Sequence, residues 1–187
     1  MSLKKLFSIS FIIIFFYLLL HHFQLLIYSG NFFSDQINNY AYSVYMPHGL
    51  RILIFLIYGY WCIPGLLIAH ILASLSNEWI SYFNFSYSVL TPTLCVPIAA
   101  LIIEKFKQEI NNKYTVTYLV LITVLSTFLN GLVTNILRYF FVNVYDREIF
   151  FDELMGYFIG DILGVAIIIL GFLILKRIFI LSVDKSY

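Results

Sequence analysis

Long apolar stretches separated by short polar segments are the feature that most restricts what this chain can fold into. A helix that crosses the hydrocarbon core of a bilayer needs about 20 mostly apolar residues, each adding about 1.5 Å. Four stretches of roughly that length lie at Leu6 to Tyr28, Phe83 to Ile103, Tyr114 to Leu137 and Met155 to Leu175. These stretches predict membrane helices, because a helix hydrogen-bonds its own backbone in lipid.

The composition indicates the same class of protein. Of the 187 residues, 61% are hydrophobic and 11% are charged, whereas soluble domains carry about 25% charged residues. The formal net charge is +1, so there is no broad basic surface that would attract nucleic acid. We therefore predict an all-α, polytopic integral membrane protein that forms a single transmembrane domain over residues 1–187 and has the lipid bilayer as its surroundings.

A fifth apolar region, Gly49 to Leu75, is long for one helix. Gly59, Pro64 and Gly65 interrupt it, and proline removes a helical donor while glycine weakens a helix. Two interpretations are open at this point. The region is either one long kinked helix or a pair of short helices with a break between Tyr60 and Pro64.

The basic residues favour the pair of short helices. Lysine and arginine concentrate on the cytoplasmic side of membrane helices. The main basic clusters are Lys4 with Lys5, then Lys105, Lys107 and Lys113, and finally Lys176, Arg177 and Lys185. A single crossing between residues 49 and 75 would separate the middle cluster from the other two, whereas a pair of helices keeps all three together. We therefore predict about six membrane helices with both termini in the cytoplasm.

One carboxylate, Asp161, lies inside the last apolar stretch. An aspartate at the centre of a membrane helix costs roughly 2.5–3.5 kcal/mol on insertion scales, so it faces the bundle interior, a water-filled cavity or a basic partner. We expect Arg51 or Arg138 to be that partner. The glycines around Asp161 let a neighbouring helix pack closely, because they repeat every fourth residue; they are Gly156, Gly160 and Gly164.

Polar residues of the preceding stretch are expected to complete this centre. Asn130, Thr134 and Arg138 follow one another at intervals of four and therefore share one helical face. The predicted ligand-binding or ion-pair site consists of Arg51, Asn130, Asn135, Arg138 and Asp161. Two interpretations remain: an ion pair that only fixes helix packing, or a site open to the outer side that binds a small anionic or polar ligand.

The sequence offers little for catalysis or metal binding. It has no glycine-flanked nucleophilic serine, no His-Glu-x-x-His and no glycine-rich phosphate loop. Cys62 and Cys95 lack a paired spacing, and we expect His48 and His70, which a helix break separates, to lack an acidic or thiol companion. We therefore predict no enzyme activity, no metal site and no cofactor.

The sequence contains two short motifs. One opens the interrupted region, and the other lies in the last apolar stretch. The first is Tyr45-Met46-Pro47-His48-Gly49, followed by Gly59 and Pro64, and the second is Gly160-Asp161-Ile-Leu-Gly164. They resemble the MASE-type membrane-associated sensor domains of bacteria, in which Pro47, His48 and Gly49 would be motif residues. The resemblance implies a multi-pass sensory module of the bacterial inner (cytoplasmic) membrane, of a kind usually fused to a cytoplasmic kinase or a cyclic-dinucleotide enzyme. Arg51 departs from the pattern, which usually has an apolar residue there.

These observations together predict a sensor-like membrane module that binds a small polar ligand or a signalling partner. We expect no output domain within these 187 residues, so a sensor implies a separate membrane or cytoplasmic partner protein. Two other classes stay open. The number of helices is also similar to that of the substrate-binding subunits of vitamin importers, which would work with an ATPase pair, and a structural or assembly subunit would need neither partner.

Overall fold

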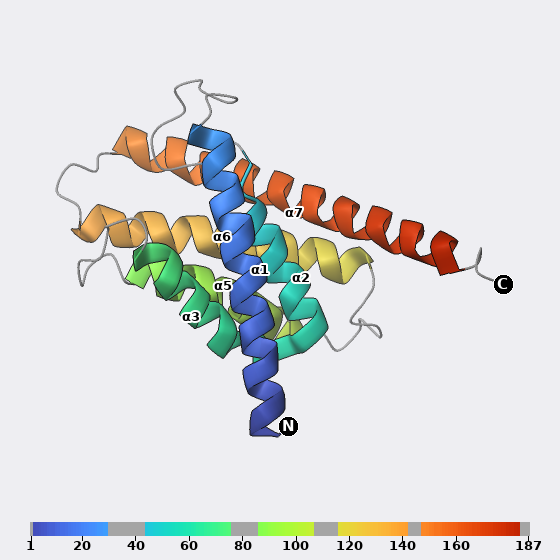
Figure 1. The fold of residues 1–187 in the computed structure, drawn as a ribbon. Coiled ribbons are helices and arrows are strands. Elements are labelled where there is room, and N and C mark those ends of the chain that lie inside the picture. Colours follow the sequence, from blue (N-terminus) through green and yellow to red (C-terminus); the bar gives the residue numbers. More distant parts are fainter. Residues whose placement is uncertain (1, 30–43, 76–85, 107–115, 142–146, 184–187) are drawn as a thin grey trace.

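The computed structural model describes residues 2–29, 44–75, 86–106, 116–141 and 147–183, and every element in them is helical (Figure 1). Five helical stretches are long and apolar enough to cross a membrane: Leu3–Ile27, Met46–Leu75, Ser88–Lys105, Val116–Phe140 and Phe150–Arg177. The prediction of an all-α polytopic membrane bundle is confirmed.

The helices follow the apolar stretches closely. They are α1 (Leu3–Ser29), α2 (Met46–Tyr58), the 3-10 turn η1 (Gly59–Cys62), α3 (Ile63–Leu75), the π-helical turn η2 (Ser86–Leu90), α5 (Thr91–Phe106), α6 (Val116–Phe141) and α7 (Arg147–Val183). α7 extends beyond both ends of its predicted stretch and has 37 residues. At 1.5 Å per residue it is about 55 Å long, which exceeds a hydrocarbon core of about 30 Å.

The chain breaks between α2 and α3 at Gly59. This glycine ends α2 with φ 58° and ψ −144°, a backbone conformation that residues with a side chain rarely adopt. The turn η1 follows, and Pro64 then lies in the first turn of α3, where its missing N–H leaves no helical hydrogen bond unmade.

Contacts with α5 show that the chain reverses at this break. Three side chains of the segment contact first the start of α5, then its end, and then its start again. Arg51 Nη1 is 2.8 Å from Pro92 O, the Tyr60 hydroxyl is 3.3 Å from Glu104 Oε2, and His70 Nδ1 is 3.1 Å from Thr93 Oγ1. The segment therefore runs along α5 to its carboxyl end and returns to its start. The prediction of two short helices is confirmed, and Gly59 to Pro64 forms a turn rather than a kink.

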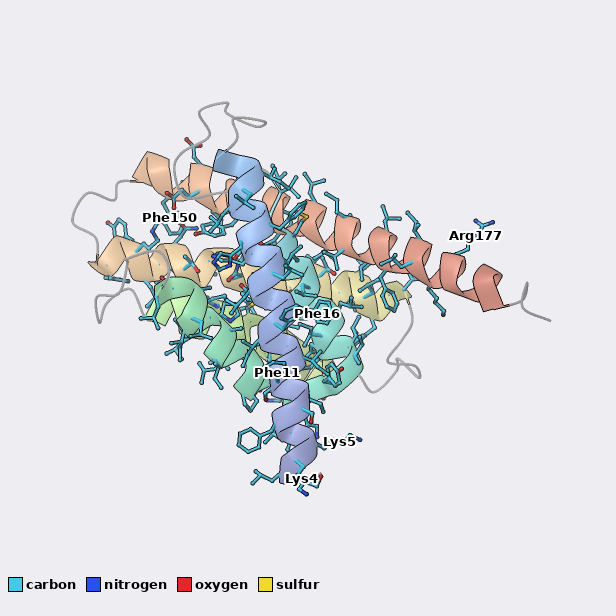
Figure 2. All side chains as sticks on the ribbon, in the orientation of Figure 1. Lys4, Lys5, Phe11, Phe16, Phe150 and Arg177 are labelled. Atoms are coloured by element: carbon cyan, nitrogen blue, oxygen red, sulfur yellow. The ribbon has the colours of Figure 1, made fainter. Side chains whose placement is uncertain are left out.

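The described members of the three predicted basic clusters lie at the start of α1, in the last turn of α5 and toward the end of α7. Gly65, just after the turn, packs on Ser10 and Ile13 of α1, so the start of α1 lies near the turn and near the end of α5. Figure 2 shows Lys4 and Lys5 at the free start of α1 and Arg177 near the free end of α7. The hairpin thus brings together the charges that a single crossing would separate.

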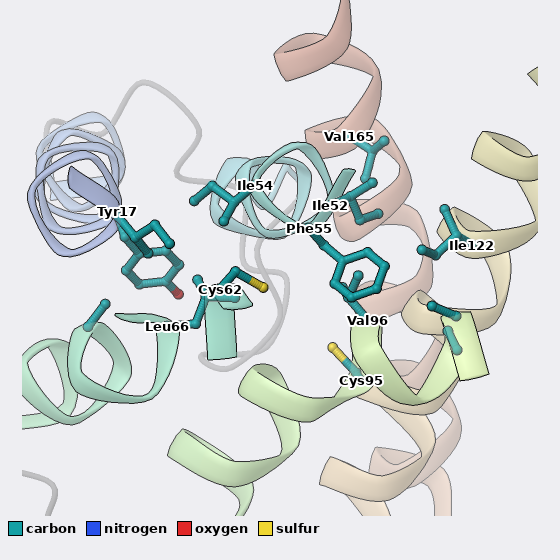
Figure 3. Packing of buried hydrophobic residues seen from close by; sticks show 14 of the residues in the cluster. Tyr17, Ile52, Ile54, Phe55, Cys62, Leu66, Cys95, Val96, Ile122 and Val165 are labelled. Carbon is teal, nitrogen blue, oxygen red and sulfur yellow. The ribbon is translucent and has the colours of Figure 1, made fainter. Parts of the chain in front are cut away.

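The apolar core lies where α2 packs between α1, α5 and α7. Figure 3 shows Tyr17 and Leu66 on one side of α2, and Val96, Ile122 and Val165 on the other. All five side chains are buried. In lipid, close packing rather than the exclusion of water holds helices together, so α2 is the element on which the bundle is assembled.

The start of α2 is fixed by a polar side chain of α1. Gln24 Nε2 donates a hydrogen bond to Val44 O at 3.1 Å, and Gln24 Oε1 accepts one from Met46 N–H at 3.0 Å. The first N–H groups of a helix have no partner within the helix, and an unpaired N–H in an apolar interior is costly. Gln24 therefore orients the entry into α2, from which the polar centre is built.

Candidate functional site

The two sequence motifs meet in the structure, where the start of α2 lies against α7. The Tyr45 N–H donates a hydrogen bond of 2.8 Å to the carbonyl of Gly160. A Cβ atom on Gly49 would lie 2.6 Å from the carbonyl oxygen of Gly164, and one on Gly164 would overlap the carbonyl of Tyr45. Gly156 is only half-buried. Gly49 and Gly164 thus allow direct contact between the two backbones.

Asp161 lies inside this contact with no exposed surface. Its Oδ2 accepts a hydrogen bond of 2.9 Å from Asn130 Nδ2 on α6 and lies 3.5 Å from His48 Nδ1 on α2. A charged acceptor makes a hydrogen bond stronger than one between neutral groups. Asp161 therefore joins three helices through one carboxylate.

The other side of the His48 ring contacts two hydroxyl groups of α6. His48 Nε2 is 3.1 Å from Ser126 Oγ and 3.2 Å from Thr127 Oγ1. The Ser126 hydroxyl donates to the carbonyl of Thr123, which leaves the Thr127 hydroxyl to donate to Nε2. A neutral imidazole that accepts at Nε2 carries its proton on Nδ1, the nitrogen that faces Asp161.

Ser126, His48 and Asp161 follow one another in the order of a nucleophile, a base and an acid. Such chemistry also needs donors aimed at a developing oxyanion. Ser126 is fully buried within α6, where the helix uses the neighbouring backbone N–H groups. We therefore interpret the three residues as a polar network that holds α2, α6 and α7 together.

The structure gives Asp161 a different direct partner from the one expected. Arg51 Nη1 donates to Pro92 O at 2.8 Å and lies 3.8 Å from Cys95 Sγ, and it attracts Asp161 only at longer range. The reason is geometric. His48 and Arg51 are three residues apart on one face of α2, and the register with α7 places His48 opposite the carboxylate.

Arg138, the other arginine expected near Asp161, pairs instead with Glu153. Arg138 Nη1 is 2.6 Å from Glu153 Oε2, and the Glu153 residue is 1% exposed. This pair and the Asn130–Asp161 pair are eight residues apart on both helices, as expected for antiparallel helices in contact. The equal spacing is the sequence signal that would have identified Glu153 as a partner.

The remaining predicted residue, Asn135, is buried and donates to the carbonyl of Gly131 one turn earlier in α6 at 2.8 Å. The structure thus brings Asn130 to Asp161, whereas Arg51 lies on α2 about one turn after His48, the residue that faces Asp161. It brings Arg138 and Glu153 together nearer the start of α7. The predicted site contained His48 only as a motif residue, left out Glu153, and did not include Ser126 or Thr127.

Several buried polar atoms around Asp161 have no hydrogen-bond partner among the residues that the structure describes. They are Asp161 Oδ1, His48 Nδ1, Arg51 Nε and Arg51 Nη2. Leaving such a group unsatisfied costs about 1–3 kcal/mol, and more for a charged group. Water molecules or a polar ligand would satisfy these atoms, so the centre is the best candidate for a binding site in the described part of the chain. No group of three or more metal-binding side chains occurs in that part.

The fold and the site define a class: a multi-pass helical membrane protein with a buried histidine–carboxylate centre that links its second and last helices. The sequence profile of MASE1, a membrane-associated sensor domain, matches residues 7–184. The chain belongs to the MASE1 family, which confirms the resemblance carried by the two motifs. No curated protein and no solved structure shows significant similarity to the chain.

Proposed function

We propose that this protein is a ligand-responsive sensor module whose sensing site is the polar centre around Asp161. The observation that carries the proposal is the meeting of the two family motifs at His48 and Asp161, 3.5 Å apart, inside a fully buried contact. Polar and ionisable groups at membrane depth are expensive and mark functional sites by default. The unsatisfied atoms beside this contact support the binding of a small polar ligand.

The signal would leave through α7. Asp161 and Gly164 fix this helix against α2, and the helix continues well past the bundle, where its side chains from Phe172 to Arg177 are exposed (Figure 1). A ligand that binds differently to two positions of α7 shifts the equilibrium between them. We infer that the exposed end of α7 passes this shift to a separate output protein, such as a kinase or a cyclic-dinucleotide enzyme.

We propose the bacterial inner membrane as the location, with both termini in the cytoplasm. The support is that the start of α1, with Lys4 and Lys5, and the end of α5, with Lys105, both lie near the η1 turn, as expected if these lysines face the cytoplasm under the positive-inside rule. An output protein in the cytoplasm would then lie on the same side as the free end of α7.

The test is native mass spectrometry of the full chain after gentle extraction, with wild type and Asp161→Asn compared. An output enzyme that travels with both forms, and whose activity responds to the module only in wild type, supports the proposal. Asp161→Asn is nearly isosteric and keeps a partner for Asn130, so the bundle should still assemble. An associated ATPase pair, or an output enzyme that responds equally to both forms, contradicts it.

A further inference from the structure

The guanidinium of Arg51 is buried, and no carboxylate of the residues that the structure describes is in contact with it. It has no exposed surface, and the acidic groups of the described residues that interact with it electrostatically are Cys95, Tyr17, Tyr45 and Asp161. Of these, Asp161 alone normally carries a charge at neutral pH, and it already accepts from Asn130 and faces His48 through Oδ2. A buried charge without a close counter-ion is strongly unfavourable.

The part of Arg51 that lacks partners is one defined edge of the group. Nη1 donates to the Pro92 carbonyl, whereas Nε and Nη2 have no hydrogen-bond partner among the described residues. The N–H bonds of Nε and Nη2 are parallel and form the side of the guanidinium that binds two oxygens of one carboxylate at once. A lysine or a single water molecule does not match this edge.

We propose that Arg51 binds the carboxylate of a small organic acid through its Nε and Nη2 edge. The ligand is small, because Arg51 is fully enclosed and the Tyr45 ring centre lies 5.5 Å from its Cζ atom. A small organic acid would be the ligand class of the proposed sensing site. Carboxylate binding at Arg51 rests on the proposed sensor function only for its biological role. Asp161 takes no part in holding the carboxylate.

The first test measures acetate binding to the full chain in lipid nanodiscs, as a saturable increase in the unfolding temperature, with chloride at equal ionic strength as the reference. Wild type should respond to acetate and not to chloride. Arg51→Lys keeps the charge but loses the paired N–H edge, so its affinity should fall about tenfold or more. Arg138→Lys is the matched control, because Arg138 is bonded to Glu153, and it should bind acetate like wild type.

The second test does not depend on a folded variant. With ¹⁵N-labelled arginine and ¹³C-carboxyl acetate, solid-state NMR of the wild-type chain should show dipolar coupling between the carboxylate carbon and Nε and Nη2 of one arginine. No coupling at saturating acetate, or equal stabilisation by chloride and acetate, overturns the proposal. Asp161→Asn should still bind acetate, so acetate binding without any Asp161-dependent output would contradict the sensor function and not this site.

Discussion

Residues that are costly to bury in a membrane define this protein. Asp161 is stabilised by a hydrogen bond from Asn130 and by His48, and Glu153 by Arg138 at 2.6 Å. Both arrangements follow the rule that intramembrane charges face the bundle interior and find partners there. The arginines differ, because Arg138 has a close carboxylate, whereas the Nε and Nη2 edge of Arg51 has none among the residues that the structure describes.

Removing one member of the Arg138–Glu153 pair should destabilise the bundle. Glu153→Ala leaves the Arg138 guanidinium buried without its counter-ion, which is expected to cost about 3–5 kcal/mol. Reversible unfolding in mixed micelles would measure the free energy of unfolding. The double variant Arg138→Leu with Glu153→Leu should be much closer to wild type, since no charge is then left unpaired. A single variant as stable as wild type would contradict the pairing.

The positions of the helices were largely predictable from the sequence. The rotation of each helix about its own axis was not. The lengths of the apolar stretches predicted the spans, and the glycine–proline break together with the lysine clusters predicted the α2–α3 hairpin. The partner of Asp161 depends on how α2 is rotated against α7. Because apolar residues surround His48 and Arg51 along the chain, the pattern does not decide which of the two faces the carboxylate.

The contact between α2 and α7 should depend on Gly164 far more than on Gly171. A Cβ on Gly164 would overlap the backbone of Tyr45, whereas no atom of the described residues lies within 4 Å of the position that a Cβ would take on Gly171. Gly164→Ala should therefore lower the free energy of unfolding by about 1–3 kcal/mol or more through overpacking. Gly171→Ala should be neutral or slightly stabilising, as for glycine in a helix interior. Equal effects of the two substitutions would contradict the close approach.

The whole molecule is a bundle in which one hairpin sets the topology. α2 runs along α5 to the end of α5, and α3 returns toward its start. The turn at Trp61 therefore lies at the same end of the bundle as the start of α1. A single kinked helix would place Trp61 near the middle of the membrane instead. The hairpin therefore predicts that water reaches Trp61.

Cysteine labelling in inverted and right-side-out vesicles tests this topology. In a chain whose Cys62 and Cys95 are replaced by alanine, Lys5→Cys and Trp61→Cys should react with a membrane-impermeant maleimide from the same side. Leu75→Cys, at the other end of α3, should react from the opposite side. Protection of Trp61→Cys from both sides would contradict the hairpin.

The central claim is that the two motifs form one coupled site through His48 and Asp161. A double-mutant cycle of His48→Ala and Asp161→Ala, read out as the free energy of unfolding in mixed micelles, tests it most directly. The control cycle pairs His48→Ala with Glu153→Ala, which lies about two turns before Asp161 in α7. We predict a coupling energy of about 0.5–2 kcal/mol for the first cycle and additivity in the control. Additive effects of His48→Ala and Asp161→Ala would contradict the account.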